Sequence, residues 1–208
     1  MLIHSVIPRS SVNGPGERTT VWLQGCKIQC RGCFNPNTHA FARTARSSTS
    51  LEMASMILGF GTSGVTFSGG EPLHQAAQLA NLMLWLKTLK PDISLGMFTG
   101  YALREVQKGA YYHPYDVSRS KLGQWNRAIN AGFWTRIAGF LDFAVMGRYN
   151  QDQPCDLPLR SRRNQTLELF SGRYTEADFE PQAVEFDVSP DFIQITGFPK
   201  EVNTYAIA

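Results

Sequence analysis

Apolar residues in the middle of the chain alternate between two spacings. Residues 64–67 and 93–98 are short apolar runs bounded by turn residues, which is typical of buried β-strands. Between them, residues 73–90 carry apolar side chains at helical spacing, and Pro91 ends that helix. The positions expected on its buried face are Ala76, Leu79, Ala80, Met83, Leu86 and Leu89.

Neighbouring segments extend this alternation. Thr49 lies three residues before Glu52, a capping-box spacing that predicts a helix over about 51–58. A further helix is expected over 102–109 and a further buried strand over 141–146. Alternating strands and helices favour parallel βαβ units with right-handed crossovers. We therefore expect an α/β fold in which parallel strands form a partial (βα) barrel.

The second half of the chain has a different pattern. Residues 124–134 have the pattern of a helix. Beyond Gly147 short strands separated by turns predominate, which predicts a β-rich C-terminal appendage. The expected strands there are 166–170, 183–188 and 192–196.

Length and composition limit the classes of protein to consider. The 208 residues suffice for one domain, which we expect to have a core over about 1–150 and an extension over about 151–208. The net charge of +3, without a basic stripe, gives no reason to expect a nucleic-acid partner. We find neither a signal-peptide core nor an apolar run long enough to span a membrane, so we expect a cytoplasmic protein without a membrane partner.

Three of the four cysteines, Cys26, Cys30 and Cys33, lie in a CxxxCxxC motif. Clustered cysteines in a reducing compartment indicate metal ligation rather than disulfide bonds. Thiolates are the ligands that iron–sulfur clusters require, and three of them on a four-iron cluster leave one iron open to another ligand. Cys155 is isolated, and we interpret it as a bystander thiol.

Other interpretations of these motifs stay open at this point. A structural zinc site needs a fourth ligand, which His39 could supply, and three buried thiols without a metal are a further alternative. The segment 68–72, Ser-Gly-Gly-Glu-Pro, follows a predicted strand. It is either an ordinary strand-to-helix turn or a place where glycines let a ligand approach the backbone closely.

The sequence around the cysteines resembles a known family. Residues 12–18 (VNGPGER), 22–26 (WLQGC) and 34–39 (FNPNTH), with the cysteine motif, are similar to the N-terminal signature of radical S-adenosylmethionine (SAM) enzymes. Among these, the chain most resembles activating enzymes of glycyl radical enzymes, in particular the activases of anaerobic ribonucleotide reductases. The resemblance implies a [4Fe–4S] cluster on the three cysteines, SAM as a second cofactor, and a partial barrel of the radical SAM type.

The resemblance also implies roles for residues outside the cysteine motif. Phe34, directly after the third cysteine, matches an aromatic position that packs near the adenine of SAM. Thr99 matches an element that contacts the SAM carboxylate or ribose. A GGE motif contacts the methionine amino group, and the matching positions are Ser68, Gly69, Gly70 and Glu71.

The implied reaction is reductive cleavage of SAM to a 5′-deoxyadenosyl radical, which takes a hydrogen from a backbone glycine of a partner glycyl radical enzyme. A flavodoxin- or ferredoxin-type protein is the implied reductant. Two other functions remain under consideration: a radical SAM enzyme acting on a small molecule, peptide or nucleotide, and a non-catalytic iron–sulfur protein for electron transfer or sensing.

Part of the chain departs from the family pattern. Residues 160–165 read Arg-Ser-Arg-Arg-Asn-Gln, where the activases have Arg-Gly-Ser-Ser-Asn-Gln. This basic run is either a solvated face or part of a docking surface for a partner protein. Tyr111, Tyr112 and Tyr115 are similarly open between an interface and internal packing.

Overall fold

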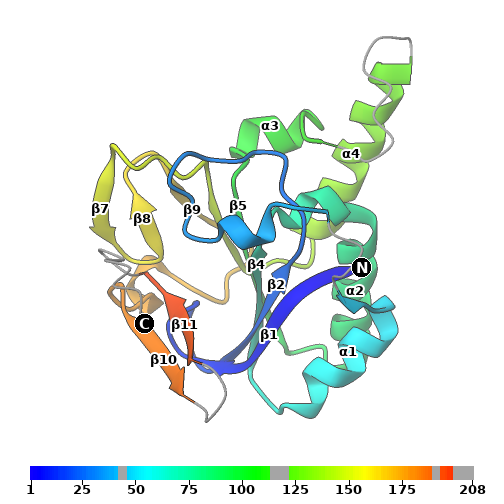
Figure 1. Cartoon of the computed structure of the whole chain (residues 1–208). Helices are drawn as coiled ribbons and strands as arrows, with labels where there is room; N and C mark the ends of the chain where they lie inside the picture. The colour runs from blue at the N-terminus through cyan, green and yellow to red at the C-terminus, as the bar shows by residue number, and fades with distance from the viewer. Residues whose placement is uncertain (42–45, 113–121, 189–192, 199–208) are drawn as a thin grey trace.

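A computed structural model describes residues 1–41, 46–112, 122–188 and 193–198 of the chain. In this part of the chain, a seven-stranded sheet carries its long helices on one side, with two β-hairpins on the other side (Figure 1). The strands are β1 (Leu2–Ser10), β2 (Arg18–Leu23), β3 (Arg46–Ser47), β4 (Gly64–Gly69), β5 (Ser94–Thr99), β6 (Phe143–Met146), β7 (Pro154–Leu157), β8 (Arg160–Arg162), β9 (Thr166–Leu169), β10 (Val184–Val188) and β11 (Ile193–Gly197).

The helices connect these strands and cover the sheet. None of those in the described residues is long and apolar enough to cross a membrane. The α-helices are α1 (Ser50–Gly59), α2 (Ala76–Leu89), α3 (Leu103–Gln107) and α4 (Leu122–Ala138), and the 3-10 turns are η1 (Pro36–Thr38), η2 (Pro72–Gln75) and η3 (Glu176–Asp178).

The main sheet is mixed, with the strand order β3-β1-β2-β4-β5-β6-β9. Its centre, β2-β4-β5-β6, is parallel, as predicted for β4, β5 and β6, whereas β1, β3 and β9 run antiparallel to their neighbours. The expectation of parallel strands is therefore correct for the centre and wrong for the edges. The physical reason at β1 is chain length, because the seven residues that separate it from β2 are too few for a crossover helix.

Several predicted elements are confirmed and some details differ. Thr49 and Glu52 form the predicted capping box, with the Glu52 backbone N–H donating to the Thr49 hydroxyl at 3.2 Å. The helix expected from residue 73 begins as the 3-10 turn η2, capped by the Glu71 side chain. Leu89, expected on the buried face of α2, is 52% exposed because it is the last residue of the helix.

Two further differences concern the ends of the chain. The pattern analysis did not predict β1 or β2, although β2 leads directly into the cysteine motif. In the C-terminal extension, β9 pairs with β6 in the main sheet, while β7–β8 and β10–β11 form separate hairpins. The extension thus adds a strand to the central sheet as well as the two hairpins.

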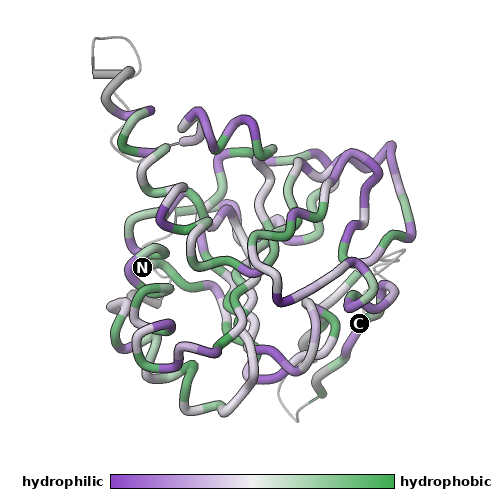
Figure 2. Tube along the Cα trace, turned by 180° about the vertical axis from the view of Figure 1, so that it is seen from behind, coloured by the Kyte–Doolittle hydropathy of each residue, from purple (hydrophilic) through white to green (hydrophobic). Residues whose placement is uncertain are grey.

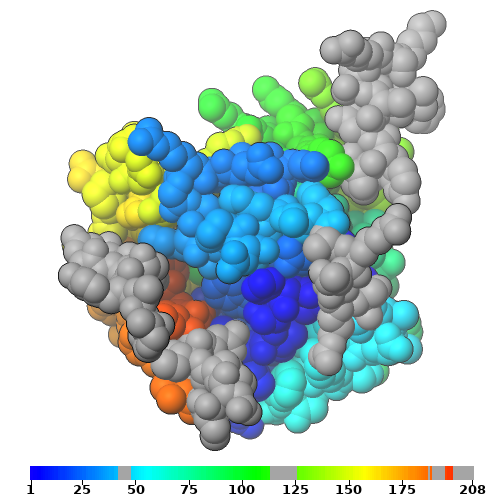
Figure 3. Space-filling view, in the orientation of Figure 1, coloured from blue at the N-terminus to red at the C-terminus, as the bar shows by residue number. Residues whose placement is uncertain are grey.

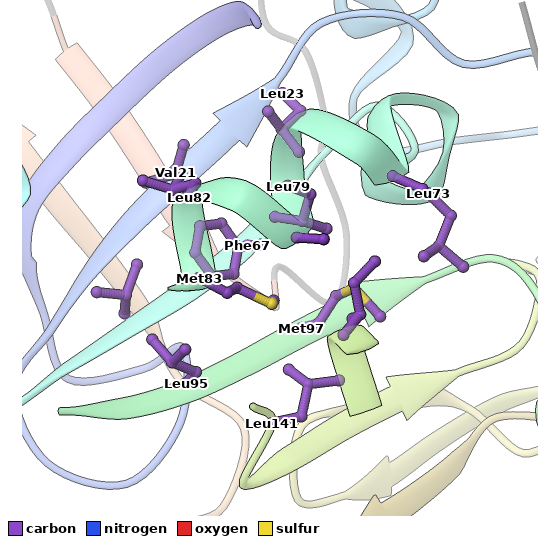
Figure 4. Close-up of a cluster of buried hydrophobic side chains, with 14 of the residues drawn as sticks. Val21, Leu23, Phe67, Leu73, Leu79, Leu82, Met83, Leu95, Met97 and Leu141 are labelled. Carbon is purple, nitrogen blue, oxygen red and sulfur yellow. The ribbon is translucent and has the colours of Figure 1, made fainter. Parts of the chain in front are cut away.

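The main hydrophobic core lies between the sheet and helices α1, α2 and α4. Hydrophobic and hydrophilic stretches alternate along the helical trace in Figure 2, as expected for helices with one buried face. Burial of each large apolar side chain contributes about 1.5–3 kcal/mol to folding. Members of this core shown in Figure 4 are Val21, Leu23, Phe67, Leu73, Leu79, Leu82, Met83, Leu95, Met97 and Leu141.

A buried arginine joins the three parallel strands β2, β4 and β5. Arg18 is 0% exposed, and its guanidinium lies 5.0 Å from the centre of the Phe143 ring. All five of its N–H groups have a hydrogen-bond acceptor, at 2.8–3.1 Å, so the cation is buried without an unpaired donor. Burial lowers its pKa to about 10, which still leaves it protonated at neutral pH. The acceptors are the Thr66 hydroxyl, the Ser94 hydroxyl and the carbonyls of Pro15, Val65 and Ser94.

We expect Arg18→Met to lower the free energy of unfolding by about 2–4 kcal/mol, because it leaves buried carbonyl groups without donors. Urea unfolding measures this change. The control is Arg9→Met, since Arg9 is an exposed residue paired with Glu17 and should change stability by less than about 0.5 kcal/mol. Equal effects of the two substitutions would contradict the structural role of Arg18.

Candidate active site

A cavity of about 800 Å³ opens at one edge of the sheet, where the carboxyl ends of the parallel strands meet. Ligand sites of α/β folds commonly occupy this edge, and the volume is within the range of small-molecule sites. The structure brings all the predicted site residues together on its wall. They are Cys26, Cys30, Cys33, Phe34, Ser68, Gly69, Gly70, Glu71 and Thr99.

The cysteine motif lies in the loop that follows β2, which we call the cysteine loop (residues 24–41). Figure 3 shows this loop in blue on the surface, between the β7–β8 hairpin and α3. The loop is closed by its own backbone, because Gly25 N–H donates to Thr38 O at 2.8 Å and Cys26 N–H donates to His39 O at 2.9 Å. The Gln24 side chain donates to Ala40 O at 2.6 Å and tightens the same closure.

Of the three cysteines in this loop, Cys26 is buried, and Cys30 and Cys33 are half-buried. Cys26 is 8% exposed, and burial raises the pKa of both Cys26 and Cys33. Among the described residues, no three His, Cys, Asp or Glu side chains converge on a point that could hold a single metal ion. A cubane cluster takes one thiolate on each of three separate irons, whereas zinc requires its ligands around one ion. Three thiolates on one loop are the kind of donor set that an iron–sulfur cluster takes.

Close backbone contact between the end of β4 and the cysteine loop explains the two glycines of the GGE motif. A Cβ at Gly70 would lie 2.5 Å from Gly25 O and 3.0 Å from Thr38 O, so no other residue fits there without a shift of the loop. Gly69 has a φ of 101°, in the region that favours glycine. The Glu71 N–H donates to Gly25 O at 3.0 Å and completes the contact.

The Glu71 side chain is directed into the protein and joins the ends of β4 and β5. It is 1% exposed, and its carboxylate accepts hydrogen bonds from Leu73 N–H at 3.0 Å, the Thr99 hydroxyl at 2.8 Å and Gly100 N–H at 2.8 Å. Burial raises its pKa to about 7 in spite of these donors. The Thr99 hydroxyl also accepts from Tyr101 N–H at 3.2 Å, so it retains a lone pair for a ligand but has no proton to donate.

Phe34 is held at the cavity wall by two side chains that the sequence analysis did not assign to the site. Its ring packs edge-on against Tyr149, with the centres 4.8 Å apart. The Arg162 guanidinium lies 4.2 Å from the Tyr149 ring centre and 5.5 Å from that of Phe34, and it donates to the Tyr149 hydroxyl. Arg162, part of the basic run, is therefore packed on aromatic rings rather than fully solvated.

The position of Tyr149 in the sequence could have indicated that it belongs to the site. Tyr149 follows the strand β6, just as Glu71 follows β4 and Thr99 ends β5, and these strands are parallel neighbours. Arg162 had no such signal, because its position depends on how the β7–β8 hairpin folds back.

The β10–β11 hairpin forms another wall of the cavity. Its strands were predicted, but their place beside the site was not. The hairpin is attached to the β1–β2 turn, where the Asn13 amide donates to the Thr196 hydroxyl at 2.9 Å and Ser11 N–H donates to Glu185 at 2.8 Å. Its residues that line the cavity are Val184, Phe186, Ile195, Thr196 and Gly197.

The tyrosines and the fourth cysteine singled out in the sequence are not part of the cavity wall as far as the structure describes them. Tyr111 is buried and its hydroxyl donates to Asn130 O at 2.5 Å, which favours internal packing, whereas Tyr115 lies outside the described residues. Cys155 is on β7, does not line the cavity, and donates to Arg160 O at 3.1 Å.

Comparisons with known proteins identify the family of the chain. Residues 12–168 match the family model described as "4Fe-4S single cluster domain". An anaerobic ribonucleoside-triphosphate reductase-activating protein of Pasteurella multocida is 36% identical over 79% of this chain and 94% of its own length. The protein of the same name from Vibrio cholerae is 36% identical over 51% of this chain and 72% of its own. A pyruvate formate-lyase-activating enzyme of Staphylococcus aureus is 40% identical over 41% of this chain and 36% of its own.

The raised pKa of Glu71 predicts a pH dependence of stability. The folded protein retains a proton on Glu71 up to a pH of about 7, whereas the unfolded chain releases it near 4.5. The contribution of this group to the free energy of unfolding therefore falls as the pH rises between these values. We expect the stability of the wild type relative to Glu71→Gln to fall by about 1–3 kcal/mol between about pH 5 and about pH 7.5.

Urea unfolding of both proteins at each pH measures this difference. His74, whose pKa burial lowers to about 4, contributes the opposite slope, but it is present in both proteins and cancels in the comparison. A difference that is constant or grows with pH would show that Glu71 is ionised in the folded protein throughout this range.

Proposed function

The chain belongs to the 4Fe–4S single cluster domain family, and from this membership we propose that it is a radical SAM enzyme that installs a glycyl radical on a partner enzyme. In this proposal Cys26, Cys30 and Cys33 hold a [4Fe–4S] cluster. The observation that carries it is the presence of these three thiols and the glycine-rich end of β4 on the wall of one cavity. Cys155 lies outside that wall, so the site offers three cysteine ligands and leaves one iron for SAM.

When bound, the cluster supplies the single electron for reductive cleavage of SAM into methionine and a 5′-deoxyadenosyl radical. The hydrogen taken from the partner's glycine Cα ends on 5′-deoxyadenosine, and the unpaired electron stays on the glycine. A flavodoxin- or ferredoxin-type protein delivers the electron that each turnover requires. The protein supplies binding, orientation and exclusion of water.

The other predicted site residues have distinct tasks in this proposal. Ser68, Gly69 and Gly70, which line the cavity, contact the methionine amino end of SAM. Phe34, held by Tyr149, offers its ring to the adenine. Thr99 accepts a hydrogen bond from a ribose hydroxyl, because its own proton is donated to Glu71. Glu71 acts through Thr99 and the backbone of Gly100 as a positioning residue.

We also propose a fold type and a cellular compartment for the protein. We propose that the main sheet is a partial barrel of the radical SAM type in a single domain, with a core over about 1–150. Support comes from the open strand order, in which the described β3 and β9 each pair with one neighbour and not with each other. A reducing compartment such as the cytoplasm would keep the three free thiols available for iron.

The function is tested with an anaerobic ribonucleoside-triphosphate reductase as the partner, after anaerobic reconstitution of the protein with iron and sulfide. With reductant and SAM, we expect 5′-deoxyadenosine to form and a glycyl radical doublet to appear on the partner in the EPR spectrum. Formation of 5′-deoxyadenosine without the doublet would exclude this partner and favour a different acceptor. Intact SAM under the same conditions would exclude radical chemistry and favour an electron-transfer or sensing protein.

The cysteines provide the matched controls for this experiment. Cys26→Ser, Cys30→Ser and Cys33→Ser should each lower the iron content and abolish 5′-deoxyadenosine formation, because a hydroxyl is a poor ligand for these irons. Cys155→Ser should retain both, since Cys155 does not line the cavity. Loss of iron in Cys155→Ser, with retention in any of the other three, would refute the ligand assignment.

A further inference from the structure

The polar residues that follow the GGE motif make contacts that the proposed chemistry does not require. Glu71 caps the turn η2, which contains His74 and Gln75, and each of the three contacts a different part of the chain. Gln75 donates to the backbone oxygen of Gln24, the first residue of the cysteine loop, at 3.2 Å. His74 is 3% exposed and contacts the cysteine loop between two of the proposed cluster ligands.

Both ring nitrogens of His74 have hydrogen-bond partners. The Lys27 backbone N–H donates to His74 Nδ1 at 3.3 Å, and Lys27 directly follows Cys26. On the other side of the ring, Nε2 lies 2.9 Å from the Tyr101 hydroxyl oxygen. Tyr112 N–H donates to the same hydroxyl at 3.1 Å. A continuous hydrogen-bonded series therefore runs from the cysteine loop to the segment after α3.

The direction of these bonds determines the tautomer of His74. Because Nδ1 accepts from Lys27 N–H, the ring proton of a neutral imidazole must be on Nε2. Nε2–H then donates to Tyr101, whose oxygen has two lone pairs and also accepts from Tyr112 N–H. In this arrangement both ring nitrogens of His74 have a partner, and the Tyr101 oxygen accepts two hydrogen bonds.

Aromatic side chains fix the orientation of the His74 ring. Phe41 stacks on it with the ring centres 6.1 Å apart, and Tyr112 packs edge-on at 5.0 Å. Tyr101 approaches its edge at 5.9 Å. A side chain enclosed in this way has few alternative rotamers, so its nitrogens are held where the backbone of the loop requires them.

We propose that His74 and Tyr101 are a positioning pair that fixes the backbone between Cys26 and Cys30 in the conformation that accepts the cluster. This inference rests on the proposed function for its purpose, although the contacts themselves do not depend on it. Without His74, the N–H of Lys27 loses its acceptor and the loop loses a tie to the rigid end of β4. Tyr101 acts through His74, because it sets the ring orientation.

Two substitutions at residue 74 separate positioning from simple packing. His74→Leu retains an apolar side chain but removes the acceptor. His74→Asn places an amide oxygen near the position of Nδ1 and can accept from Lys27 N–H. Tyr101→Phe removes the partner of Nε2. Ile137→Ala, in the core on α4 and 0% exposed, is the matched control for a general loss of stability.

The first measurement is hydrogen exchange of the Lys27 amide in the cluster-free protein. The second is the rate at which a chelator removes iron from the reconstituted protein, together with its EPR spectrum. We expect His74→Leu to accelerate both exchange and iron loss about tenfold or more, as loss of an outer-shell contact typically does. His74→Asn should recover most of both effects, Tyr101→Phe should show a smaller acceleration, and Ile137→Ala should show neither.

Three results would overturn the inference: wild-type behaviour of His74→Leu, no recovery in His74→Asn, or equal acceleration in Ile137→Ala. Failure of the wild type to bind iron would refute the proposed function instead. In that case, exchange at Lys27 in the cluster-free protein still decides whether His74 holds the loop.

Discussion

The close approach of β4 to the cysteine loop is the contact on which the site depends. Gly70 lies against the backbone of Gly25 and Thr38 at a distance that leaves no room for a side chain. Once this contact is made, the turn that follows it is placed between β5 and the cysteine loop. Glu71 then joins the ends of β4 and β5, and His74 reaches the backbone next to Cys26. The GGE motif is thus a structural junction as well as a candidate ligand-binding segment.

The parallel centre of the sheet explains why a small protein can assemble such a site. The four strands β2, β4, β5 and β6 end at the same edge, and the segment after each contributes a different part of the cavity wall. The cysteines follow β2, the glycines end β4, Thr99 ends β5 and Tyr149 follows β6. At the opposite end of the strands, the saturated hydrogen bonds of Arg18 join β2, β4 and β5. Rigid strands therefore support the loops that carry the chemistry.

Local spacing in the sequence was sufficient to predict the cysteine motif, the glycine-rich turn, the strands β4, β5 and β6 and the helices between them. The predicted residues meet in one cavity because strand ends in a parallel sheet share an edge. Features that depend on tertiary contacts were not predicted. Arg162 reaches Phe34 only because the β7–β8 hairpin folds back, and no periodicity indicated that β10–β11 would line the cavity. The antiparallel edges follow from short connections rather than from the pattern within each strand.

The central claim is that the three cysteines leave one iron open and that SAM binds there. EPR spectroscopy of the anaerobically reconstituted, dithionite-reduced protein tests this most directly, when spectra are recorded with and without SAM. The account predicts a reduced [4Fe–4S] signal whose g-values change when SAM is added, because the ligand environment of one iron changes. A reduced cluster signal that is identical with and without saturating SAM would contradict the account.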